Sequence, residues 1–524
     1  MTDRELDPDD HRRMARKLRE PSRFPHPVDT IETVETHIST LLLTETHAYK
    51  LKKPLDLGFL DFTSLERRRA ACDEELRINR RLAPEFYLQR IAITGTPEDP
   101  VIGGQGPTLD WAVQMSRFDD SRLFDRLCET SALTSDSLED VARQVAEFHQ
   151  TATVAAPDSE WGTIEAIAEP ARDNLTELQD QLGSEARLDR LSNWTEACLS
   201  EFEQRFQDRR AAGRVRECHG DLHLGNIVDV DGRAVIFDGI EFAPELRWID
   251  VINEVAFLDM DLRQRQRPDL AAVFLSAYFE RTGDYDGVAL LPFYRAYRAL
   301  VRAKVSGLRA DDPDADTKAR EKARQMREAY IAVAEAQTRP PAPRLLLMHG
   351  LSGSGKSTVA RAVVERLDAL RLRSDVERKR LAGLDANTRA GAGFGEGLYG
   401  PEQTEKTYQR LEGLAAELLE AGTSVVVDAA SLRRKERERF RRLAGRAGVA
   451  FTLVVCDAPE TRLRERIAER QQTGTDPSDA DTSVLDSQIA SYQPPAADEQ
   501  DDRLVIDTEN DPGFAALDNL QRQH

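Results

Sequence analysis

The pattern of apolar and polar positions divides the chain into two regions. In the first region, the alternation typical of strands is followed by long stretches of helical periodicity. The expected elements are strands over 35–44 and 47–54, a helix over 65–82, helices within 135–210, a strand–loop–strand unit over 214–237 and helices from 247 to 335. A small β-rich lobe followed by a larger helical lobe predicts an α+β domain.

In the second region, short apolar runs alternate with amphipathic helices. The runs have the length of strands and lie at 345–350, 370–375, 424–430, 451–458 and 503–508. Regular alternation of strand and helix is typical of a parallel sheet covered by helices. The second region is therefore predicted to be an α/β domain.

A seam between the regions lies at about 309–343. It begins with a charged stretch, continues through a helical run and ends in the proline-rich sequence TRPPAPR. Each proline fixes φ and removes a backbone donor, so the prolines form a short stiff spacer. The predicted division is a polar N-terminal tail over 1–24, a first domain over 25–335, a linker over 336–343 and a second domain over 344–524.

Composition and charge exclude several classes of protein. The 524 residues are 40% hydrophobic and 31% charged, with a mean hydropathy of −0.53, which indicates a soluble globular protein. No apolar run approaches the length of a membrane span, and the mixed-charge N-terminus is unlike a secretory signal. A formal net charge of −21 argues against general binding to nucleic acid or an anionic membrane. Five scattered cysteines without CxxC spacing indicate reduced thiols and a cytoplasmic protein.

A phosphate-binding motif opens the second domain. The sequence GLSGSGKS at 350–357 fits G-x-x-x-x-G-K-[ST], with a predicted strand before it and a helix after it. Backbone N–H groups would curl around phosphate oxygens, Lys356 would meet the β- and γ-phosphates, and the Ser357 hydroxyl would hold Mg²⁺. The alternative is a Gly- and Ser-rich turn before an ordinary helix. The expected ATP-binding residues are Gly350, Leu351, Ser352, Gly353, Ser354, Gly355, Lys356, Ser357 and Thr358.

Acids at the ends of two later strands complete this expected site. Asp375 could orient a substrate hydroxyl or hold the metal through water, and it could also cap the next helix. Arg378, one helical turn later, could clamp an anionic substrate. Asp428 is expected to hold the Mg²⁺ water shell, the alternative being an ordinary strand-end aspartate. A basic helix farther on resembles a closing lid, in which Arg466 or Arg470 would supply charge or simply lie on a solvated face.

The order of these motifs resembles the P-loop kinase family that includes polynucleotide kinases, gluconate-kinase-like enzymes and zeta-toxin-like proteins. The succession GLSGSGKST, RSDVER, VVVDAASLRRKERERF and CDAPETRLRERIAER is especially similar to that of 5′-hydroxyl polynucleotide kinases. The resemblance covers about 345–495 and implies a P-loop nucleoside-triphosphate hydrolase fold. It also implies that Asp375 activates the acceptor hydroxyl and that Arg378 contacts substrate phosphate.

A second constellation lies in the first domain, within ECHGDLHLGNIVDVDGRAVIFDGIEF at 217–242. Phosphoryl transfer needs an acid to orient the incoming hydroxyl and oxygen ligands to hold Mg²⁺ on the nucleotide. Asp221 suits the first role, and Asn226 and Asp238 suit the second. A predicted hairpin would bring Asn226 and Asp238 together, and His219 is expected to tether the loop. The alternative is a polar loop with capping aspartates.

A lysine that binds the nucleotide phosphates is expected on a strand of the small lobe. The sequence HAYKLKKP places Lys50 and Lys52 on one face of that strand. Lys50 is preferred and Lys52 is its rival. The partner on the following helix is expected to be Glu75, with Glu74 close behind. The alternative is a solvated basic edge strand.

These residues resemble the aminoglycoside phosphotransferase and choline-kinase-like superfamily, which shares the protein-kinase catalytic core. The similarity is tight over 217–261, where RWIDVINEVAFLDMDL is similar to the helix after the metal-binding aspartate, and it implies that Asp250 supports the catalytic loop. The whole chain, with segments such as AYKLKKPLDLGFLDFTSLERR and GLYGPEQTEKTY, is similar to a bacterial two-domain family labelled bifunctional aminoglycoside phosphotransferase/ATP-binding protein.

The sequence therefore predicts a tandem kinase with two ATP·Mg²⁺ sites, each transferring the γ-phosphoryl group to a hydroxyl of a small molecule. One alternative is an ATP-binding switch that has no separate acceptor. Another is a polynucleotide 5′-hydroxyl kinase activity in the second domain. Neither a membrane nor an obligatory protein partner is expected.

Overall fold

The computed structural model describes residues 6–521, except 59, 184, 314, 385–399, 474–481 and 512, and gives only the backbone of 470–473, 519 and 521. The chain divides into two compact units. Unit 1 comprises Met1–Val141, Glu147–Pro170 and Glu201–Leu258, and unit 2 comprises Ala142–Ala146, Ala171–Ser200 and Asp259–His524. The helices after Leu258 are thus grouped with the P-loop region, and the proline-rich spacer lies inside unit 2.

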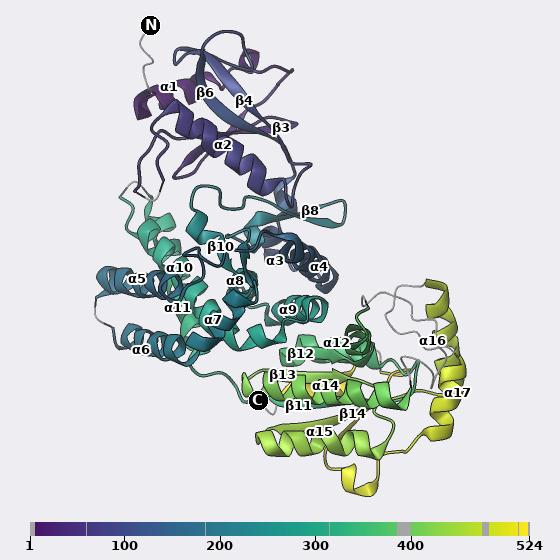
Figure 1. Cartoon of the computed structure of the whole chain (residues 1–524). Helices are drawn as coiled ribbons and strands as arrows, with labels where there is room; N and C mark the ends of the chain where they lie inside the picture. Colours follow the sequence, from purple (N-terminus) through teal and green to yellow (C-terminus); the bar gives the residue numbers. More distant parts are fainter. Residues whose placement is uncertain are drawn as a thin grey trace. The chain divides into compact units, whose positions relative to one another are not determined.

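Unit 1 contains a six-stranded antiparallel sheet in the order β1-β2-β3-β6-β4-β5 (Figure 1). Its strands are β1 (Glu32–Glu35), β2 (Ser39–Leu43), β3 (His47–Lys52), β4 (Tyr87–Thr96), β5 (Asp99–Ile102) and β6 (Thr108–Ser116). Helix α2 (Leu65–Asn79) packs against β4 and β6. The arrangement carries the candidate lysines on β3 and the candidate glutamates on α2.

The prediction of a polar tail is wrong for residues 6–24. Helix α1 (Pro8–Lys17) begins at an N-cap Asp7, whose side chain accepts a hydrogen bond from the Asp10 N–H. Met14 and Leu18, spaced one helical turn apart, are buried in a cluster with apolar residues of the sheet. The polar residues between them hide this periodicity when the segment is judged by composition alone.

The remainder of unit 1 is mainly helical and carries two small sheets. Strands β8 (Ile227–Val230) and β9 (Arg233–Ile236) form an antiparallel hairpin, and β7 (Val215–Glu217) pairs with β10 (Trp248–Asp250). The helices that lie wholly or mainly in this unit are α3 (Phe124–Glu129), α4 (Ser135–Thr151), α7 (Glu203–Ala211) and α8 (Val251–Gln264). A buried cluster that includes Leu76, Val113 and Val235 joins α2, the larger sheet and the hairpin.

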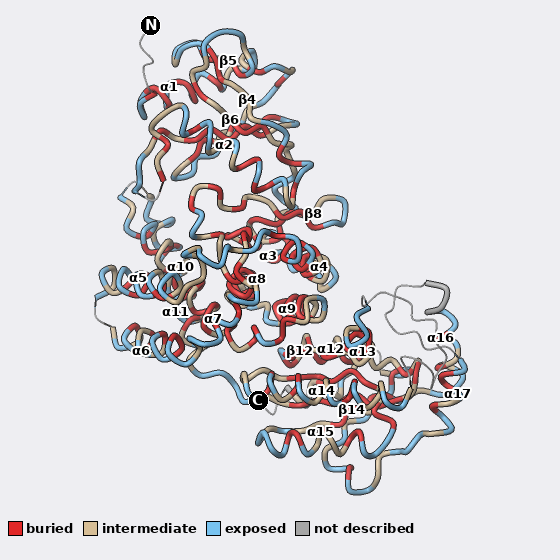
Figure 2. Tube along the Cα trace, in the orientation of Figure 1, coloured by how far each residue is buried: buried red, intermediate tan, exposed pale blue. Residues whose placement is uncertain are grey.

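Unit 2 contains a five-stranded parallel sheet in the order β12-β13-β11-β14-β15, which confirms the predicted α/β fold. The strands are β11 (Arg344–His349), β12 (Ala369–Arg373), β13 (Ser424–Asp428), β14 (Ala450–Asp457) and β15 (Arg503–Asp507). In Figure 2 its central strands are buried along most of their length. The carboxyl ends of parallel strands share one edge of a sheet, so residues that follow β11, β12 and β13 can form one site.

Helices cover this sheet from several parts of unit 2. Helix α12 packs against β12 and β13, and α15 packs against β11 and β14 (Figure 1). Helix α9 packs against both α12 and the edge strand β12. The helices of this unit are α5 (Ile164–Leu182), α6 (Ala186–Glu201), α9 (Pro268–Thr282), α10 (Leu291–Ala310), α11 (Thr317–Gln337), α12 (Lys356–Leu367), α13 (Ser374–Leu381), α14 (Pro401–Glu420), α15 (Arg434–Ala447), α16 (Glu460–Thr473), α17 (Thr482–Ser491) and α18 (Asp518–Gln521).

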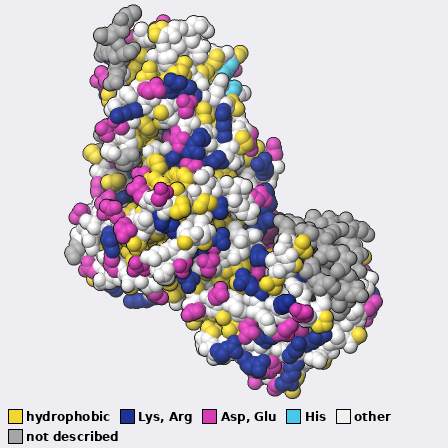
Figure 3. Space-filling model, viewed as in Figure 1, with side chains coloured by type: hydrophobic (Ala, Val, Ile, Leu, Met, Phe, Trp, Pro, Cys, Tyr) yellow, Lys and Arg dark blue, Asp and Glu magenta, His cyan; other side chains and the backbone are white. Residues whose placement is uncertain are grey.

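The surface carries charges of both signs. On the face shown in Figure 3, Lys and Arg side chains are interspersed with Asp and Glu. All five cysteines lie in the described part of the chain and are buried, without a disulfide between them. None of the described helices combines the length and the apolar character that crossing a bilayer requires.

Candidate functional site

In unit 1, a charged cluster joins the small-lobe strand, helix α2 and the segment after β9. The Lys50 Nζ lies 2.8 Å from Glu75 Oε1 and 2.7 Å from Asp238 Oδ1. Burial by itself lowers the pKa of Lys50, but the carboxylates of Asp238 and Glu75 raise this pKa well above its usual value. The structure thus brings together three of the residues that the sequence analysis selected, from positions up to 188 residues apart.

Lys52, the rival of Lys50, forms a second and deeper part of this cluster. Its Nζ lies 2.6 Å from Glu75 Oε2 and also pairs with Glu241. Lys52 and Glu75 are fully buried, and Glu241 is only 6% exposed. Burial by itself raises the pKa of Glu75, but Lys50 and Lys52 lower this pKa to about 2. Glu75 therefore contacts both lysines, and only Lys50 also reaches Asp238 through an ion pair in the described residues.

The loop after β7 presents Asp221 beside Asn226. The Asn226 Nδ2 donates to both Asp221 O and Asp221 Oδ2 at 3.0 Å. His223 Nε2 lies 3.3 Å from Asp221 Oδ2. Asp221 remains about one-third exposed, so an incoming hydroxyl can approach its carboxylate.

Backbone hydrogen bonds hold this loop against the segment that carries Asp238. The Phe237 N–H donates to Asn226 O at 3.0 Å, and the Ile240 N–H donates to His219 O at 3.0 Å. Asp238 itself adopts a φ of +60°, a left-handed conformation that is costly for a residue other than glycine. The Tyr87 hydroxyl supports this conformation by accepting a hydrogen bond from the Asp238 N–H at 3.1 Å.

A carboxylate on α8 supports the loop from below, and it is not the one that the resemblance implied. Glu254 Oε1 and Oε2 accept the His219 and Gly220 N–H groups at 2.9 Å each. Asp250 instead binds Arg209 on α7, at 2.8 and 2.9 Å. The carboxylate that supports the loop was therefore expected four residues too early in the sequence. Asp250 lies on the short strand β10, and α8 begins only after it. His219 does bond to the loop's neighbour, since its Nε2 lies 2.9 Å from Phe237 O.

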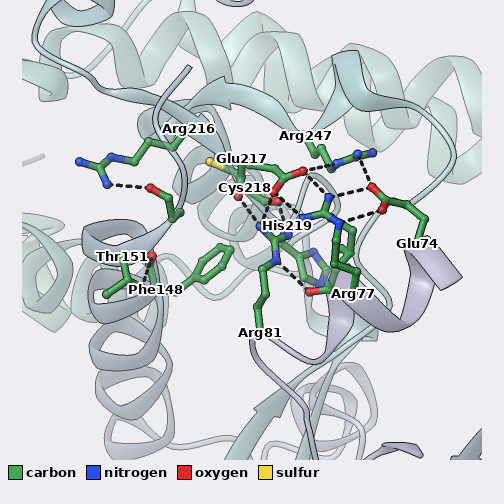
Figure 4. Close-up of polar contacts among 12 residues, drawn as sticks. Glu74, Arg77, Arg81, Phe148, Thr151, Arg216, Glu217, Cys218, His219 and Arg247 are labelled. Carbon is green, nitrogen blue, oxygen red and sulfur yellow. Dashed lines mark hydrogen bonds and ion pairs between the residues drawn. The ribbon is translucent and has the colours of Figure 1, made fainter. Parts of the chain in front are cut away.

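Glu74, the rival of Glu75, takes part in a separate network. Figure 4 shows Arg77 and Arg247 between the carboxylates of Glu74 and Glu217. Arg81 adds hydrogen bonds to Glu217 O at 2.7 Å and to Cys218 O at 3.0 Å. Glu217 ends β7 directly before the loop that carries Asp221. Glu74 therefore anchors α2 to the start of this loop, on a different face of the helix from Glu75.

In unit 2, the residues of the phosphate-binding motif lie between β11 and α12. Gly353 has a φ of +81°, and a Cβ at this position would lie 2.6 Å from Leu463 O, so only glycine fits. Gly355, with a φ of +82°, is the N-cap of α12. The Lys356 Nζ donates to Leu351 O at 2.8 Å. The loop thus has the backbone turn from which N–H groups can contact phosphate oxygens.

A cavity of about 380 Å³ opens beside this loop. It is lined by most of the residues that the sequence analysis selected for the second site, namely Ser352, Gly353, Gly355, Lys356, Ser357, Thr358, Asp375, Arg378, Asp428 and Arg466. Gly350, Leu351 and Ser354 of the motif lie outside the described lining. Sequence reasoning missed Arg373, Tyr408 and Glu436, which also line the cavity. Arg373 is the first residue of RSDVER. In a chain with so many arginines, the sequence gives no reason to select this one.

Two acids in this cavity have different surroundings. Asp375 Oδ1 lies 2.6 Å from Arg378 Nη1, within α13. Asp428 is 6% exposed, and its buried Oδ2 has no hydrogen-bond partner among the described residues. A buried carboxylate oxygen without a hydrogen-bond donor is costly unless cations balance it, and Arg373 Nε lies 4.0 Å from this oxygen, beyond hydrogen-bonding distance. Asp428 and the Ser357 hydroxyl therefore fit a Mg²⁺ ion held mainly by nucleotide phosphates.

The expected lid is described only in part. Arg466, on α16, donates to Thr508 O at 2.8 Å, to Thr508 Oγ1 at 3.0 Å and to Gly353 O at 3.3 Å. It therefore braces the phosphate loop as well as lining the cavity. The side chain of Arg470 and the segment 474–481 lie outside the described residues.

His349, the last residue of β11, predicts a pH dependence of stability. It is fully buried, with Nδ1 3.0 Å from Ser431 O and Nε2 3.1 Å from Tyr492 Oη, and burial lowers its pKa to about 4. Because this pKa is below the unfolded value of about 6.5, the contribution to stability is present above pH 6.5 and lost as the pH falls towards 4. It should amount to about 2 kcal/mol between pH 6.5 and 5. In urea unfolding at several pH values, His349→Gln should make the decline shallower, and an unchanged slope would contradict this.

Comparisons with known proteins match each region separately, and relatives match about three quarters of the chain. A family model described as phosphotransferase enzyme family matches residues 60–291, and one described as AAA domain matches residues 345–495. Uncharacterized proteins of Mycobacterium tuberculosis and Mycobacterium bovis are 33% identical to this chain over 411 residues. The match covers 77% of this chain and 79% of theirs.

Solved kinase structures are similar to parts of the chain. An APS kinase of Mycobacterium tuberculosis is 26% identical, covering 34% of this chain and 99% of its own, with a TM-score of 0.25. A choline/ethanolamine kinase family protein from Mesorhizobium loti is 13% identical, covering 62% of this chain and 99% of its own, with a TM-score of 0.39. A gluconokinase from Sinorhizobium meliloti 1021 is 21% identical, covering 35% of this chain and 95% of its own, with a TM-score of 0.25.

Proposed function

Because this chain belongs to the same family as its mycobacterial relatives and joins a phosphotransferase domain to a P-loop kinase domain, we propose that it is a tandem kinase with two ATP·Mg²⁺ sites. The chain is an ATP-dependent phosphotransferase. Each site would transfer the γ-phosphoryl group to a hydroxyl of a small molecule. The first would use residues of unit 1, and the second would use the cavity of unit 2.

One observation carries the proposal: in each unit, an acid suited to a hydroxyl lies in the same site as cations suited to phosphate. In unit 1, Asp221 lies on the loop bonded to the Asp238 segment, and Asp238 pairs with Lys50. In unit 2, Asp375 and Lys356 line one cavity. A module that only binds nucleotide needs the cations but has no need of the acids.

The residues of each site have distinct roles in the proposed reaction. Lys50, fixed by Glu75, would bind nucleotide phosphates in unit 1, and Lys356 would do so in unit 2. Asp221 and Asp375 would each orient an acceptor hydroxyl and accept its proton. This positioning lowers the entropy cost of bringing acceptor and phosphoryl group together.

Magnesium would be held by Asn226 and Asp238 in unit 1, and by Ser357 and Asp428 in unit 2. Within the described residues, no three His, Cys, Asp or Glu side chains converge into a metal cage. Such a sparse ligand set suits Mg²⁺, which keeps several waters and relies on substrate phosphates. When bound, the ion would neutralise charge on the transferring group.

The number of nucleotides bound per chain tests this proposal. Isothermal titration calorimetry of the full chain with Mg²⁺ and a non-hydrolysable ATP analogue should give two bound molecules. Lys50→Met and Lys356→Ala should each leave one, because each removes the cation of a single site. Lys53→Met, which changes a lysine paired with the exposed Glu35, is the matched control and should leave two.

Two outcomes would count against the proposal. A single bound nucleotide in the unmodified chain would remove one site. Binding without label transfer from [γ-³²P]ATP to any component of a pool of small hydroxylated metabolites would favour a nucleotide-dependent switch.

A further inference from the structure

Arg373 lines the unit 2 cavity, but the motifs give it no role. It is the last residue of the edge strand β12, and its register partner on the neighbouring strand is Asp428. The Arg373 Nε lies 4.0 Å from Asp428 Oδ2, and the side chain is only 12% exposed. A guanidinium at this point lies next to the carboxylate proposed to bind Mg²⁺.

A carboxylate on helix α9 holds Arg373 in this position. Glu280 Oε1 lies 3.3 Å from Arg373 Nη1, and Glu280 Oε2 lies 3.0 Å from Arg371 Nη2. Burial by itself raises the pKa of Glu280, but the two arginines lower this pKa, which keeps the carboxylate charged. The Arg371 N–H also donates to Ser276 Oγ at 3.1 Å, so α9 is bonded to the backbone of β12 as well.

Three other cations of the cavity have protein contacts at the phosphate loop or at Asp375, the acid proposed to orient the acceptor. Lys356 donates to Leu351 O, Arg378 pairs with Asp375, and Arg466 braces Gly353 and Thr508. Arg373, which is part of the cavity lining, differs because one of its two carboxylate partners, Glu280, lies outside that lining. A cation held from behind is already oriented before the ligand binds, which strengthens its interaction with a charged group.

We propose that Arg373 contacts the γ-phosphoryl group of ATP in the P-loop site and that Glu280 is its positioning residue. The inference rests on the proposed function of unit 2. A fixed guanidinium next to the metal-binding acid can form charge-assisted hydrogen bonds to the oxygens of the transferring group. Glu280 lies within the segment 60–291 that the phosphotransferase family matches, so the P-loop site depends on a helix outside its own family region.

The test compares nucleotides with and without the γ-phosphate in the full chain. Fluorescent N-methylanthraniloyl (mant) AMP-PNP and mant-ADP are titrated with Mg²⁺ in a Lys50→Met background, so that only the P-loop site binds. Glu280→Gln should weaken mant-AMP-PNP binding about tenfold, as expected for a misplaced charged hydrogen bond. Its mant-ADP affinity should stay within about twofold, because ADP lacks the contacted group.

Four further variants separate positioning from general stability. Arg373→Gln should reproduce the selective loss, and combining it with Glu280→Gln should add nothing, since both act through one guanidinium. Arg373→Lys should recover part of the affinity because it keeps the charge. Arg371→Gln is the matched control: it removes the other guanidinium on Glu280, lies outside the described cavity lining and should leave both affinities unchanged.

The outcomes distinguish this inference from the proposed function. Equal losses for both nucleotides in Glu280→Gln and Arg373→Gln, or no loss in either, would overturn the inference and leave the P-loop site intact. If Glu280→Gln does not fold, Arg373→Gln decides by the same comparison. If the Lys50→Met chain binds neither nucleotide, or still binds both after Lys356→Ala, the proposed P-loop site fails and the inference fails with it.

Discussion

An Asp221→Asn variant of the full chain is expected to lose one of two transfer activities by about 10²–10⁴-fold, the range for removing a general base. Asp375→Asn should lose the other activity by a similar factor. Asparagine keeps the shape of the side chain but cannot accept the hydroxyl proton. Nucleotide binding should persist in both variants, because neither change removes a phosphate-binding cation.

The measurement is transfer of label from [γ-³²P]ATP to small hydroxylated metabolites, with the products separated by chromatography. Asp231→Asn is the matched control, since this exposed residue lies in the turn between β8 and β9. It should retain both activities. Two variants that each abolish the same labelled product would indicate one reaction instead of two, and full retention of all products in Asp221→Asn would exclude unit 1 as a catalyst.

Replacing Lys52 by methionine should destabilise unit 1 by about 3–5 kcal/mol, the cost of breaking a buried ion pair and leaving its partner unpaired. Lys52 is fully buried and is the only cation that contacts Glu241 through a salt bridge in the described residues. Without it, the buried Glu241 would lose this salt bridge, and Glu75 would keep only Lys50, which also pairs with Asp238. The free energy of unfolding from urea titration with circular dichroism would measure the effect.

The neighbouring lysine provides the control. Lys53→Met changes a partly exposed residue paired with Glu35, and such a surface pair contributes at most about 1 kcal/mol. The double variant Lys52→Met/Glu241→Gln should recover part of the loss, because it removes a charge that has lost its partner. Equal stabilities of Lys52→Met and Lys53→Met would contradict the buried arrangement.

The two folds were predictable to different degrees. Strands β11 and β13 of unit 2 are continuous apolar runs, because both faces of the centre of a parallel sheet are covered, and all five strands of this sheet were predicted. Strands β4, β5 and β6 were missed. The burial of β4 does not alternate regularly, and Gly95, Gly103 and Gly104 interrupt the region, so neither periodicity nor length marks these strands.

In the sites, too, features set by neighbouring residues could be predicted, whereas contacts between residues far apart in the sequence could not. The phosphate loop is specified by eight consecutive residues, whose glycines take up the required backbone conformation. The choice between Glu74 and Glu75 depends on which face of α2 meets β3, a rotation of about 100° that only packing determines. The pairing of Glu280 with Arg373 spans 93 positions and crosses the proline-rich spacer, so no sequence motif reports it.

Helix α9 also bears on how such a protein can evolve. The spacer at 336–343 is the place where a gene-fusion history would be sought, since the two family matches end before it and begin after it. Yet α9, which lies before the spacer, covers the edge of the sheet that lies after it. Recombination at the spacer would therefore transfer a P-loop module without α9. Its edge strand β12 would be exposed, and exposed edge strands promote self-association. The long segment of unit 2 begins at Asp259, so a P-loop module with this strand covered would have to be inherited from about that residue onward.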